Sequence, residues 1–495
     1  MIEWIGYSLL TIYIVALVYI TVFCLVQFQL LYHYKQHKKR FSSKQPLNGE
    51  DESNYPFITV QLPIFNERYV VERLIENIIH LDYPKEKMEI HVIDDSTDIT
   101  KELAKKAIEN YQDSGINISH ITRPNREGFK AGALKEAMQY ARGDYICIFD
   151  ADFLPKPDFL RRVLPYFEDD QVGVVQTRWE HINQDFSLLT RLQAFQLNVH
   201  FTVEQKGRDA GNLMLQFNGT AGVWRRETIE DAGGWEADTL TEDLDLSYRA
   251  QLKGWKIIFR EDIGSPAELP AEMNSLKSQQ FRWMKGGAET AKKMLPTVWK
   301  SSLKPVQKFH ATMHLLSSTV FLFVFVIGVF SVPILFFLNP LGIDPTYLGV
   351  FMLALLSIIT VYFSANMELA EKDEPWIKTF FKFIFLFPVF LALSMGLSLH
   401  NSIAVIQGYL GKKSAFVRTP KLNITKIGDR LRKTDYGYNK ISLITALEGM
   451  LALYFAGGLL GAYMINDGSF LLLHLLLVLG YGTTFYYSVK HSNIK

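Results

Sequence analysis

Two kinds of hydrophobic pattern divide the chain. Residues 5–31 form one uninterrupted apolar stretch that carries no charged side chain. As a helix rising about 1.5 Å per residue, this stretch would be roughly 40 Å long, which is enough to cross a bilayer. Residues 33 to about 305 instead have the mixed character of soluble protein. Long apolar stretches then return at 313–338, 346–366, 378–407, 441–464 and 469–487. The pattern therefore predicts a soluble domain held between membrane helices.

Within the soluble part, the segment 57–175 alternates β-rich stretches with amphipathic helical ones. The β-rich stretches read FITVQLP, MEIHVID, INISHIT, YICIFD and VGVVQT. Helical stretches such as ERYVVERLIENIIH and TKELAKKAIENYQ lie between them. This alternation predicts βαβ units, and hence an α/β domain with a parallel, Rossmann-like sheet covered by helices. In such sheets, ligands bind beyond the carboxyl ends of the strands.

Three of these strand ends carry polar residues. They are PIFNE at 63–67, DDSTD at 94–98 and DAD at 150–152. Carboxylates of this kind suit Mg²⁺ or Mn²⁺, which usually need only one or two carboxylates plus substrate phosphates. Asp pairs at strand ends are also common as simple turns or helix caps, and DAD alone leaves that alternative open. The companion pair Asp94–Asp95, at another strand end, favours the metal–phosphate interpretation.

Two further motifs lie later in the soluble part. In LTEDLDLSYRAQL, Thr241 could cap a helix whose first turn contains Glu242 and Asp243, where acidic side chains suit the helix dipole. In QQFRWMKGG, Arg282 offers a cation suited to a diphosphate, and Trp283 offers a flat face suited to a sugar ring. The alternative for the second motif is an amphipathic helix on the membrane surface with an interfacial tryptophan.

The charge pattern and the cysteine content indicate the cellular compartment of the soluble domain but not its activity. The net charge is +1, so the charge balance implies no nucleic-acid partner. The two cysteines, Cys24 and Cys147, have no plausible disulfide partner, which fits a reducing compartment. The basic segment 35–40 follows the first apolar stretch directly, and this predicts a cytoplasmic soluble domain.

Taken in order, the motifs resemble those of family 2 glycosyltransferases of the processive, cellulose-synthase-like kind. That family carries an Asp pair, a D-x-D, a T-E-D and a Q-x-x-R-W, with membrane helices on both sides. The phrases FKAGALKEAM, FDADFLPKPDFL, HFTVEQ and FNGTAGVWR are most similar to the cellulose-synthase-like A and C groups, which make mannan, glucomannan and xyloglucan backbones. FVRTPK at 416–421 resembles the gating loop of bacterial cellulose synthase, but it departs from that loop at Arg418 and Pro420.

This resemblance implies a GT-A-type domain and a role for each matching residue. Asp243 would be the general base that takes the proton of the acceptor hydroxyl. The donor nucleotide and its diphosphate would be bound by Asp94, Asp95, Lys130, Asp150, Gln279 and Arg282. A divalent metal, Mg²⁺ or Mn²⁺, would be held by Asp152 and Asp150. The acceptor would be contacted by Trp283, Asn218, Gly219, Thr220 and Glu242. The gating loop would contribute Phe416, Arg418, Thr419 and Lys421.

The implied activity is an inverting transfer of hexose, from GDP-mannose or UDP-glucose, to a growing β-linked polysaccharide that is then translocated. The implied location is the cell (inner) membrane, with several crossings and a cytoplasmic catalytic domain. Two alternatives stay open: a non-processive transferase acting on a lipid such as a ceramide or polyprenyl phosphate, and a non-catalytic scaffold subunit. The expected divisions are an anchor at 1–34, a linker at 35–55, the GT-A domain at 56–290, an interfacial helix at 291–312, and a channel region at 313–495 that includes the gating-loop-like segment 408–440.

A simple count of crossings conflicts with the charge pattern. If every apolar stretch after the soluble domain crossed once, residues 408–440 would lie outside. This segment contains nine Lys or Arg residues and two Asp residues, which favours the cytoplasmic side. We therefore expect the stretch 378–407 to re-enter the membrane or to lie partly in its interface, with a break at Pro388.

Overall fold

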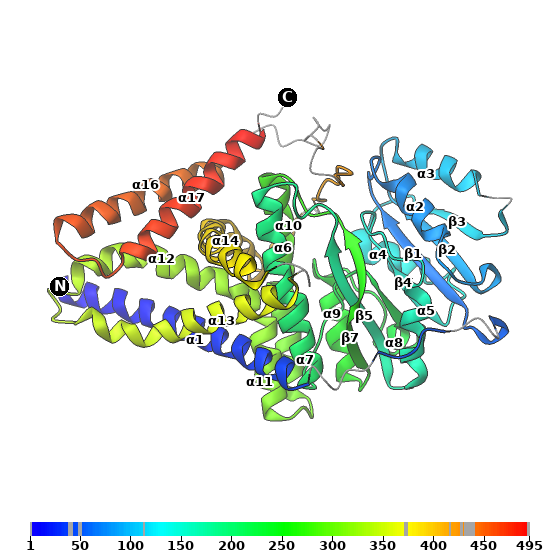
Figure 1. The fold of residues 1–495 in the computed structure, drawn as a ribbon, viewed down its shortest axis with the longest axis horizontal. Coiled ribbons are helices and arrows are strands. Elements are labelled where there is room, and N and C mark those ends of the chain that lie inside the picture. Colours follow the sequence, from blue (N-terminus) through cyan, green and yellow to red (C-terminus); the bar gives the residue numbers. More distant parts are fainter. Residues whose placement is uncertain are drawn as a thin grey trace.

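The computed structural model describes residues 2–37, 43–47, 52–111, 114–370, 375–414, 417–425, 429 and 441–492. A seven-stranded sheet with its covering helices stands at one end of the molecule, and a group of long apolar helices stands at the other (Figure 1). The expected combination of an α/β domain and flanking membrane-type helices is confirmed.

The sheet is mixed. Its order is β3-β2-β1-β4-β6-β5-β7. The strands are β1 (Ile58–Ile64), β2 (Met88–Asp94), β3 (Asn117–Thr122), β4 (Tyr145–Ile148), β5 (Val172–His181), β6 (Gly222–Arg225) and β7 (Lys256–Ala267). Strand β6 runs antiparallel to both β4 and β5, and the other neighbours are parallel. The parallel sheet expected from the sequence is thus interrupted by one short strand, which pairs antiparallel between β4 and β5.

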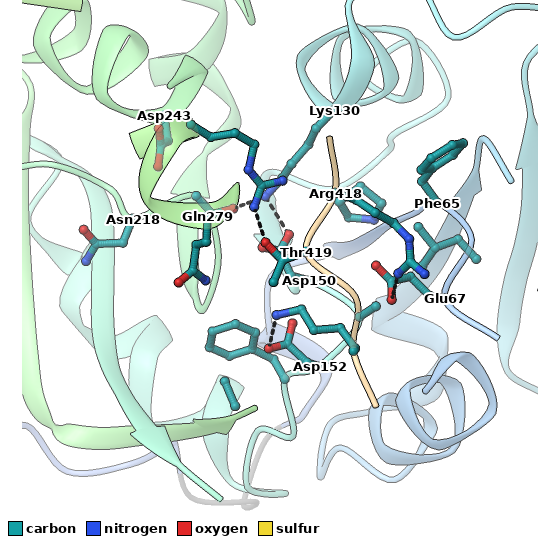
Figure 2. A pocket seen from close by; sticks show the side chains of 18 of the residues that line it. Phe65, Glu67, Lys130, Asp150, Asp152, Asn218, Asp243, Gln279, Arg418 and Thr419 are labelled. Carbon is teal, nitrogen blue, oxygen red and sulfur yellow. Dashed lines mark hydrogen bonds and ion pairs between the residues drawn. The ribbon is translucent and has the colours of Figure 1, made fainter. Parts of the chain in front are cut away.

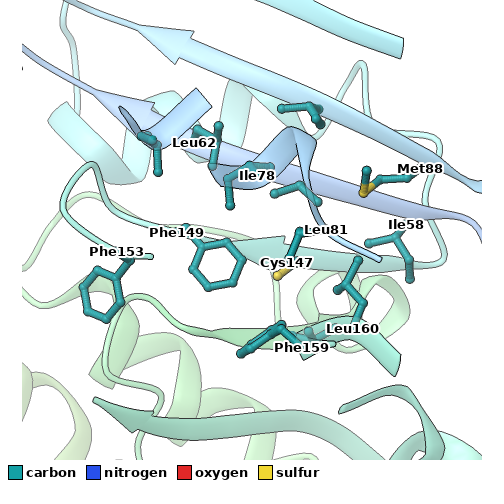
Figure 3. Packing of buried hydrophobic residues seen from close by; sticks show 14 of the residues in the cluster. Ile58, Leu62, Ile78, Leu81, Met88, Cys147, Phe149, Phe153, Phe159 and Leu160 are labelled. Carbon is teal, nitrogen blue, oxygen red and sulfur yellow. The ribbon is translucent and has the colours of Figure 1, made fainter. Parts of the chain in front are cut away.

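The core explains why the strand ends are fixed in place. The strand β1 is buried on nearly its whole length, and helix α2 (Val71–Ile79) presents Leu74, Ile75 and Ile78 to it at helical spacing. Figure 3 shows Ile78 between β1 and the ring of Phe149, which directly follows β4. Cys147 is a free thiol in this core. This packing holds the carboxyl ends of β1, β2 and β4 side by side.

The remaining helices of the sheet domain are short. They are α3 (Thr100–Glu109), α4 (Phe129–Ala137), α5 (Phe159–Val163), α6 (Leu188–Val199), α7 (Lys206–Ala210), α8 (Arg226–Asp231) and α9 (Glu242–Leu252). A π-helical turn, His200–Gln205, joins α6 to α7. The long helix α10 (Met273–Lys300) and the helix α11 (Pro305–Leu315) follow β7. The boundary expected after residue 290 falls inside α10, so it marks no break in the structure.

Six helices in the described part of the chain are long and apolar enough to cross a membrane. They are α1 (Ile2–His37), α12 (Val320–Phe337), α13 (Met352–Glu368), α14 (Trp376–Gly396), α16 (Leu443–Met464) and α17 (Leu471–Ser492). In Figure 1, five of them run lengthwise away from the sheet domain, whereas α14 is seen almost end-on. The rings of Phe383 and Phe390 on α14 lie 5.9 and 5.6 Å from the ring of Phe195 on α6. Helix α14 therefore lies across the others, against the sheet domain.

The segment around α14 begins and ends at the same end of the molecule. Glu368, at the end of α13, lies 3.7 Å from Lys35 at the end of α1. After α14, the helix α15 (Ser398–Tyr409) packs along α10, and the chain then enters the sheet domain. The break expected at Pro388 was wrong, because α14 continues from Trp376 to Gly396 with Pro388 inside it. The helix ends instead at Gly396, whose backbone packs against Gly480 of α17.

Candidate active site

A cavity of about 210 Å³ lies at the carboxyl ends of β1, β2 and β4. It gathers residues that are far apart in the sequence. Of the residues expected from the sequence, it is lined by Asp95, Lys130, Asp150, Asp152, Asn218, Gly219, Glu242, Asp243, Gln279, Arg282, Trp283, Arg418, Thr419 and Lys421. Asp94 and Thr220 do not line it, and Phe416 lies outside the described residues.

The first carboxylate of the D-x-D motif is held by a partly buried lysine. Asp150 Oδ1 lies 2.6 Å from Lys130 Nζ, which also donates to the carbonyl oxygen of Gly219 at 2.8 Å (Figure 2). Burial disfavours the Lys130 ammonium, yet the carboxylates of Asp150 and Glu242 raise the pKa of Lys130 above its ordinary value. The backbone N–H of Asp150 donates to Thr220 Oγ1, so Thr220 holds the backbone of the motif in place.

The second carboxylate, Asp152, faces a lysine from the other half of the chain. Its Oδ2 accepts hydrogen bonds from Lys421 Nζ at 2.7 Å and from the Glu268 N–H at 3.3 Å. The Asp152 side chain is buried, and its Oδ1 has no hydrogen-bond partner among the described residues. A buried carboxylate with one oxygen unsatisfied and the other on a displaceable ammonium suits a divalent cation. Asp150 and Asp152 thus fit the metal expected from the sequence.

A tighter cluster of carboxylates elsewhere does not compete with this site. Glu236, Asp238 and Asp245 have oxygens close enough to share a metal ion. Lys293 Nζ lies within 3.0 Å of all three carboxylates. Arg249 also lies 2.7 Å from Asp245, so we interpret the cluster as an ion-pair network that joins α9 to α10.

The Asp94–Asp95 pair separates into two different environments. Asp94 is fully buried and accepts hydrogen bonds from the Ser96 N–H at 2.8 Å and from His120 Nε2 at 2.9 Å. Asp95 lines the cavity, and its carboxylate is bound by the guanidinium of Arg123 through two nitrogens. Asp94 lies outside the cavity because successive side chains of a strand point to opposite faces, and its expected contact with the nucleotide stays a prediction.

Asp243 stands at the N-terminus of α9 and faces the cavity. Its Oδ1 accepts the backbone N–H of Leu244 at 2.8 Å. Burial, together with the neighbouring charge of Glu242, raises the pKa of Asp243 to about 7. Thr241 does not cap the helix through its side chain, since its Oγ1 lies 3.0 Å from that of Thr290 on α10. The carboxyl of Asp243 thus lines the cavity, and its raised pKa is suited to proton transfer near neutral pH.

The glycine of FNGTAG is required by this arrangement. Gly219 has φ of 78°, and a Cβ added there would stand 3.0 Å from Asp243 Oδ2. A side chain at this position would have to adopt the left-handed conformation and also crowd the carboxylate. Gly219 lets the backbone pass between Asp243 and Lys130.

The chain after α15 already lies in the cavity, and Figure 2 shows it crossing in front of the strand ends. Arg418 Nη1 lies 2.9 Å from Glu67 Oε2, and Thr419 Oγ1 accepts from Arg282 Nη2 at 2.9 Å. Glu268 accepts the backbone N–H groups of Leu422 and Asn423 at 2.8 and 2.9 Å. Burial raises the pKa of Glu67 to about 7, although the Arg418 charge opposes the shift. We call residues 417–425 the site loop.

Several residues of the cavity were not expected from the sequence. Glu67 and Glu268 hold the site loop, and Arg126 lies with its guanidinium carbon 3.3 Å from the centre of the Phe65 ring. Trp179 and His181 line the cavity from β5. Burial lowers the pKa of His181 to about 3, and neither of its ring nitrogens has a hydrogen-bond partner among the described residues.

A signal for the β5 residues was present in the sequence. Trp179 and His181 alternate along the strand that ends VQTRWEH, so they share one face of the sheet. For Glu67, the stretch PIFNE marked the strand end without indicating a role. For Glu268 there was no local sign, because its partners are backbone groups more than a hundred residues away.

A second cavity, of about 550 Å³, adjoins the first. The two share Trp179, Leu197, Asn218, Thr241, Asp243 and Trp283 as lining residues. Away from the site, its walls are largely apolar and come from α1, α12, α13 and α14, including Ile20, Val324, Ile358 and Phe390. Asp243 and Trp283 therefore stand where a charged cavity in the sheet domain meets an apolar cavity among the long helices.

The site thus combines a carboxylate-lined cavity at the strand ends of an α/β domain with long apolar helices beside it, as the sequence motifs predicted. A family model described as "Glycosyltransferase like family 2" matches residues 56–286. Residues 56–286 therefore match the family that the sequence motifs indicated.

Known proteins similar to this chain agree with that assignment. Glucomannan 4-beta-mannosyltransferase 1 of Oryza sativa subsp. japonica is 42% identical over 261 residues, which cover 50% of this chain and 50% of that protein. Glucomannan 4-beta-mannosyltransferase 7 of Arabidopsis thaliana is 40% identical over 276 residues, 54% of this chain and 50% of that protein. The chain spans about half the length of the curated relatives it matches.

Among solved structures, the mannosyltransferase PcManGT from Pyrobaculum calidifontis, determined in complex with GDP-Man and Mn²⁺, has a similar fold. Its TM-score is 0.52 with 20% sequence identity, and the match covers 83% of this chain and 100% of that one. The likeness supports the GT-A-like fold of this chain.

Proposed function

We propose that the protein transfers mannose from GDP-mannose to a growing β-linked mannan or glucomannan and passes the product into the membrane. The observation that carries this proposal is the position of Asp243, which lines both the charged cavity and the apolar one. The choice of mannose rests on the names of the plant relatives and on the GDP-Man complex of the archaeal mannosyltransferase.

The donor would lie in the charged cavity. Asp150 and Asp152 would hold the divalent metal, which, when bound, neutralises the developing charge on the departing nucleoside diphosphate. Lys421 would have to leave Asp152 for this to happen, and its ammonium would then be free to meet the diphosphate. Lys130, Arg282 and Arg418 would add fixed positive charge around the same group.

The acceptor would approach from the apolar cavity. Trp283 would stack on its terminal sugar, because a flat ring offers dispersion contact to a pyranose face. Asp243 would take the proton from the attacking hydroxyl, and its pKa of about 7 suits a base that operates near neutral pH. A single displacement with one base inverts the anomeric centre and needs no second carboxylate acting as nucleophile.

The topology follows from the site loop. Residues 417–425 touch Asp152, Glu67 and Glu268, so they lie on the same side of the membrane as the sheet domain. Helix α14 would then rest in the membrane interface, and the other five candidate spans would cross. The basic segments that follow α1 and α15 favour the cytoplasm for this side.

One observation also favours a second candidate, transfer to a lipid acceptor. The walls of the larger cavity are mainly apolar and could accommodate an acyl or prenyl chain. The cavity's position next to Trp283 suits a saccharide equally, so the acceptor is the point to test.

The decisive experiment uses purified full-length protein in vesicles with Mn²⁺. GDP-mannose and UDP-glucose are supplied separately, and the products are analysed for length and linkage. We expect turnover of GDP-mannose and a β-linked polymer. Products that extract into organic solvent and carry a single sugar would favour the lipid-acceptor alternative, and turnover of UDP-glucose alone would overturn the choice of donor.

A further inference from the structure

A buried lysine lies beside the Q-x-x-R-W motif and is not among the groups assigned to the substrates. Lys285 follows Trp283 by two residues on α10, and its side chain is completely buried. It lines neither of the two cavities. A lysine is seldom buried to this extent unless its ammonium is paired. The partners of this ammonium therefore indicate what the residue does.

The ammonium of Lys285 holds the chain that leads into the site loop. Its Nζ donates to the carbonyl oxygen of Lys412 and, at 2.7 Å, to Ser414 Oγ. It also lies 3.8 Å from the carboxylate of Glu289, one turn further along α10. Two hydrogen bonds and one carboxylate thus compensate the buried charge. Residues 412–414, which we call the loop root, are thereby attached to the motif helix.

The sequence brings the loop root over Lys285 by ending α15 with a left-handed glycine. Gly411 has φ of 69°, and the backbone N–H of Lys412 donates back to the carbonyl oxygen of Gln407 at 3.0 Å, which closes the helix end. One turn earlier, a Cβ added at Gly408 would stand 2.6 Å from the carbonyl oxygen of Lys285. The backbones of α15 and α10 therefore meet directly at this point, and the loop root starts from a fixed position.

A second lysine of α10 holds the chain beyond the site loop. Lys277 Nζ lies 2.8 Å from Glu448 Oε2 on α16, and both side chains are buried. Between the two lysines on α10, Arg282 donates to Thr419 Oγ1 at 2.9 Å. The described parts of the segment between α15 and α16 are thus attached to α10 before, within and after the site loop.

These attachments differ in whether a substrate would compete for them. Within the site loop, Lys421 contacts Asp152 and Arg418 contacts Glu67, and all four line the cavity where the metal and the diphosphate would bind. The three groups around the Lys285 ammonium line neither cavity. A donor that enters can therefore displace the middle of the site loop without competing for the loop root.

We infer that Lys285 is a positioning residue, which fixes the loop root to the motif helix so that the site loop moves about a constant point and returns Arg418 and Thr419 to the bound diphosphate. A fixed root leaves the loop with fewer conformations to lose when it closes over the donor. The inference rests on the proposed function for the identity of the donor. The attachment of the loop can be measured without any donor.

The test uses the full-length protein with three substitutions. Lys285→Met keeps the length of the side chain and removes its donors. Ser414→Ala removes one acceptor of the same contact from the side of the loop. Lys300→Met makes the first change at the exposed last residue of α10, so it controls for the loss of a lysine from this helix.

Opening of the loop is measured first, without substrates. Thr419 is 4% exposed and both native cysteines are buried, so the labelling rate of Thr419→Cys with a maleimide reports how often the loop opens. We expect Lys285→Met to speed this labelling roughly tenfold or more, and Ser414→Ala to speed it by a smaller factor. Combined with Lys285→Met, Ser414→Ala should add less than it does alone, because the two groups share one contact. Lys300→Met should leave the rate unchanged.

Metal binding and donor use should then change in opposite directions. With the loop root released, Lys421 leaves Asp152 more often, so Lys285→Met should bind Mn²⁺ alone several-fold more tightly in an electron paramagnetic resonance titration. The KM for GDP-mannose should rise roughly tenfold because the closed loop is less populated. The KM for a manno-oligosaccharide acceptor should stay the same. General damage to the fold would instead weaken the binding of metal and donor together.

Two outcomes would overturn the inference. Labelling of Lys285→Met at the unchanged rate would mean that the lysine does not hold the loop, and faster labelling with an unchanged KM for GDP-mannose would remove its positioning role. If Lys285→Met does not fold, Ser414→Ala decides, and an unchanged labelling rate in that variant overturns the inference. If the wild-type protein does not use GDP-mannose, the proposed function fails instead, and the labelling rates still decide whether Lys285 holds the loop.

Discussion

The two cavities that meet at Asp243 differ in the polarity of the residues that line them. The smaller one, at the strand ends, is lined by charged side chains that are already paired with one another, such as Lys130 with Asp150 and Lys421 with Asp152. The larger one has apolar walls, and its polar groups near the junction are amides and imidazoles joined by hydrogen bonds.

This difference matches the two substrates of a glycosyl transfer. A nucleoside diphosphate needs fixed charge, and ion pairs that can open keep those charges satisfied until it binds. A neutral polymer needs flat surfaces and a few hydrogen bonds, and strong charge along its path would hold it back. The carboxyl that we propose as the base belongs at the boundary, because only there can it reach both substrates. The comparison can be tested by removing one element at a time.

The largest effect is expected for Asp243→Asn, which removes the base at the boundary. Transfer should fall by roughly 10²–10⁴-fold, because the amide cannot accept the hydroxyl proton. Binding of GDP with Mn²⁺ should be nearly unchanged, since the metal is assigned to Asp150 and Asp152. Calorimetry and turnover on the same sample check both statements, and substantial residual transfer would contradict the assignment of the base.

Asp152→Asn should damage the donor side as a whole. The variant loses a charged ligand from a site with few protein ligands, so Mn²⁺-dependent GDP binding should weaken by roughly a hundredfold. Acceptor binding should be affected far less. The measurement is GDP affinity as a function of Mn²⁺ concentration. An unchanged Mn²⁺ dependence would show that Asp152 is not a metal ligand.

Trp283→Ala should damage the acceptor side in the complementary way. Loss of the stacking face should raise the KM for oligosaccharide about tenfold, while GDP affinity stays close to that of the wild type. Asp152→Asn should therefore weaken GDP binding and leave acceptor binding nearly unchanged, whereas Trp283→Ala should do the opposite. If both affinities fall together, Trp283 has a structural role in α10 instead.

A smaller effect is expected for Lys421→Met, which keeps the length of the side chain and removes its charge. Lys421 Nζ lies 2.7 Å from Asp152 Oδ2, so a cation that binds Asp152 must displace the ammonium. The variant should bind Mn²⁺ alone several-fold more tightly, which electron paramagnetic resonance titration measures directly. Lys413→Met, at an exposed position before the site loop, is the matched control. Equal Mn²⁺ affinity in both variants would mean that the ammonium does not compete with the metal.

The sequence predicted the parts of the fold that local pattern controls. Strands that end in DDSTD and DAD were placed correctly at one sheet edge, because the βαβ alternation determines their direction. The pattern could not separate Asp94 from Asp95, since the difference depends on which face each side chain takes and on distant partners such as Arg123. The sequence pattern did not predict the short strand β6, because its antiparallel pairing with β4 and β5 forms only in the folded sheet.

The membrane part shows the same limit. Hydropathy cannot distinguish a helix that crosses a bilayer from one that lies along it, and α14 satisfies the composition of a span. The basic charge of the segment after it is the sequence evidence for the interfacial placement of α14 that we propose. Contacts such as Glu268 with the backbone of the site loop, or Gln216 with Asn218, have no sequence signature, because they join segments only after folding.

The smallest expected effect concerns pH and uses the neighbour of the base. The pKa of Asp243 is raised to about 7 by burial and by the charge of Glu242. The base is active when it is deprotonated, so kcat/KM should fall as the pH drops below about 7. Glu242→Gln removes the adjacent negative charge, which lowers the pKa of Asp243 and moves this limb to lower pH by up to about one unit. The pH dependence of kcat/KM for wild type and variant is the measurement, with Glu227→Gln on α8 as an exposed control. A limb that stays in place would mean that Asp243 does not control it, and a limb that moves to higher pH would reverse the proposed coupling between the two carboxyls.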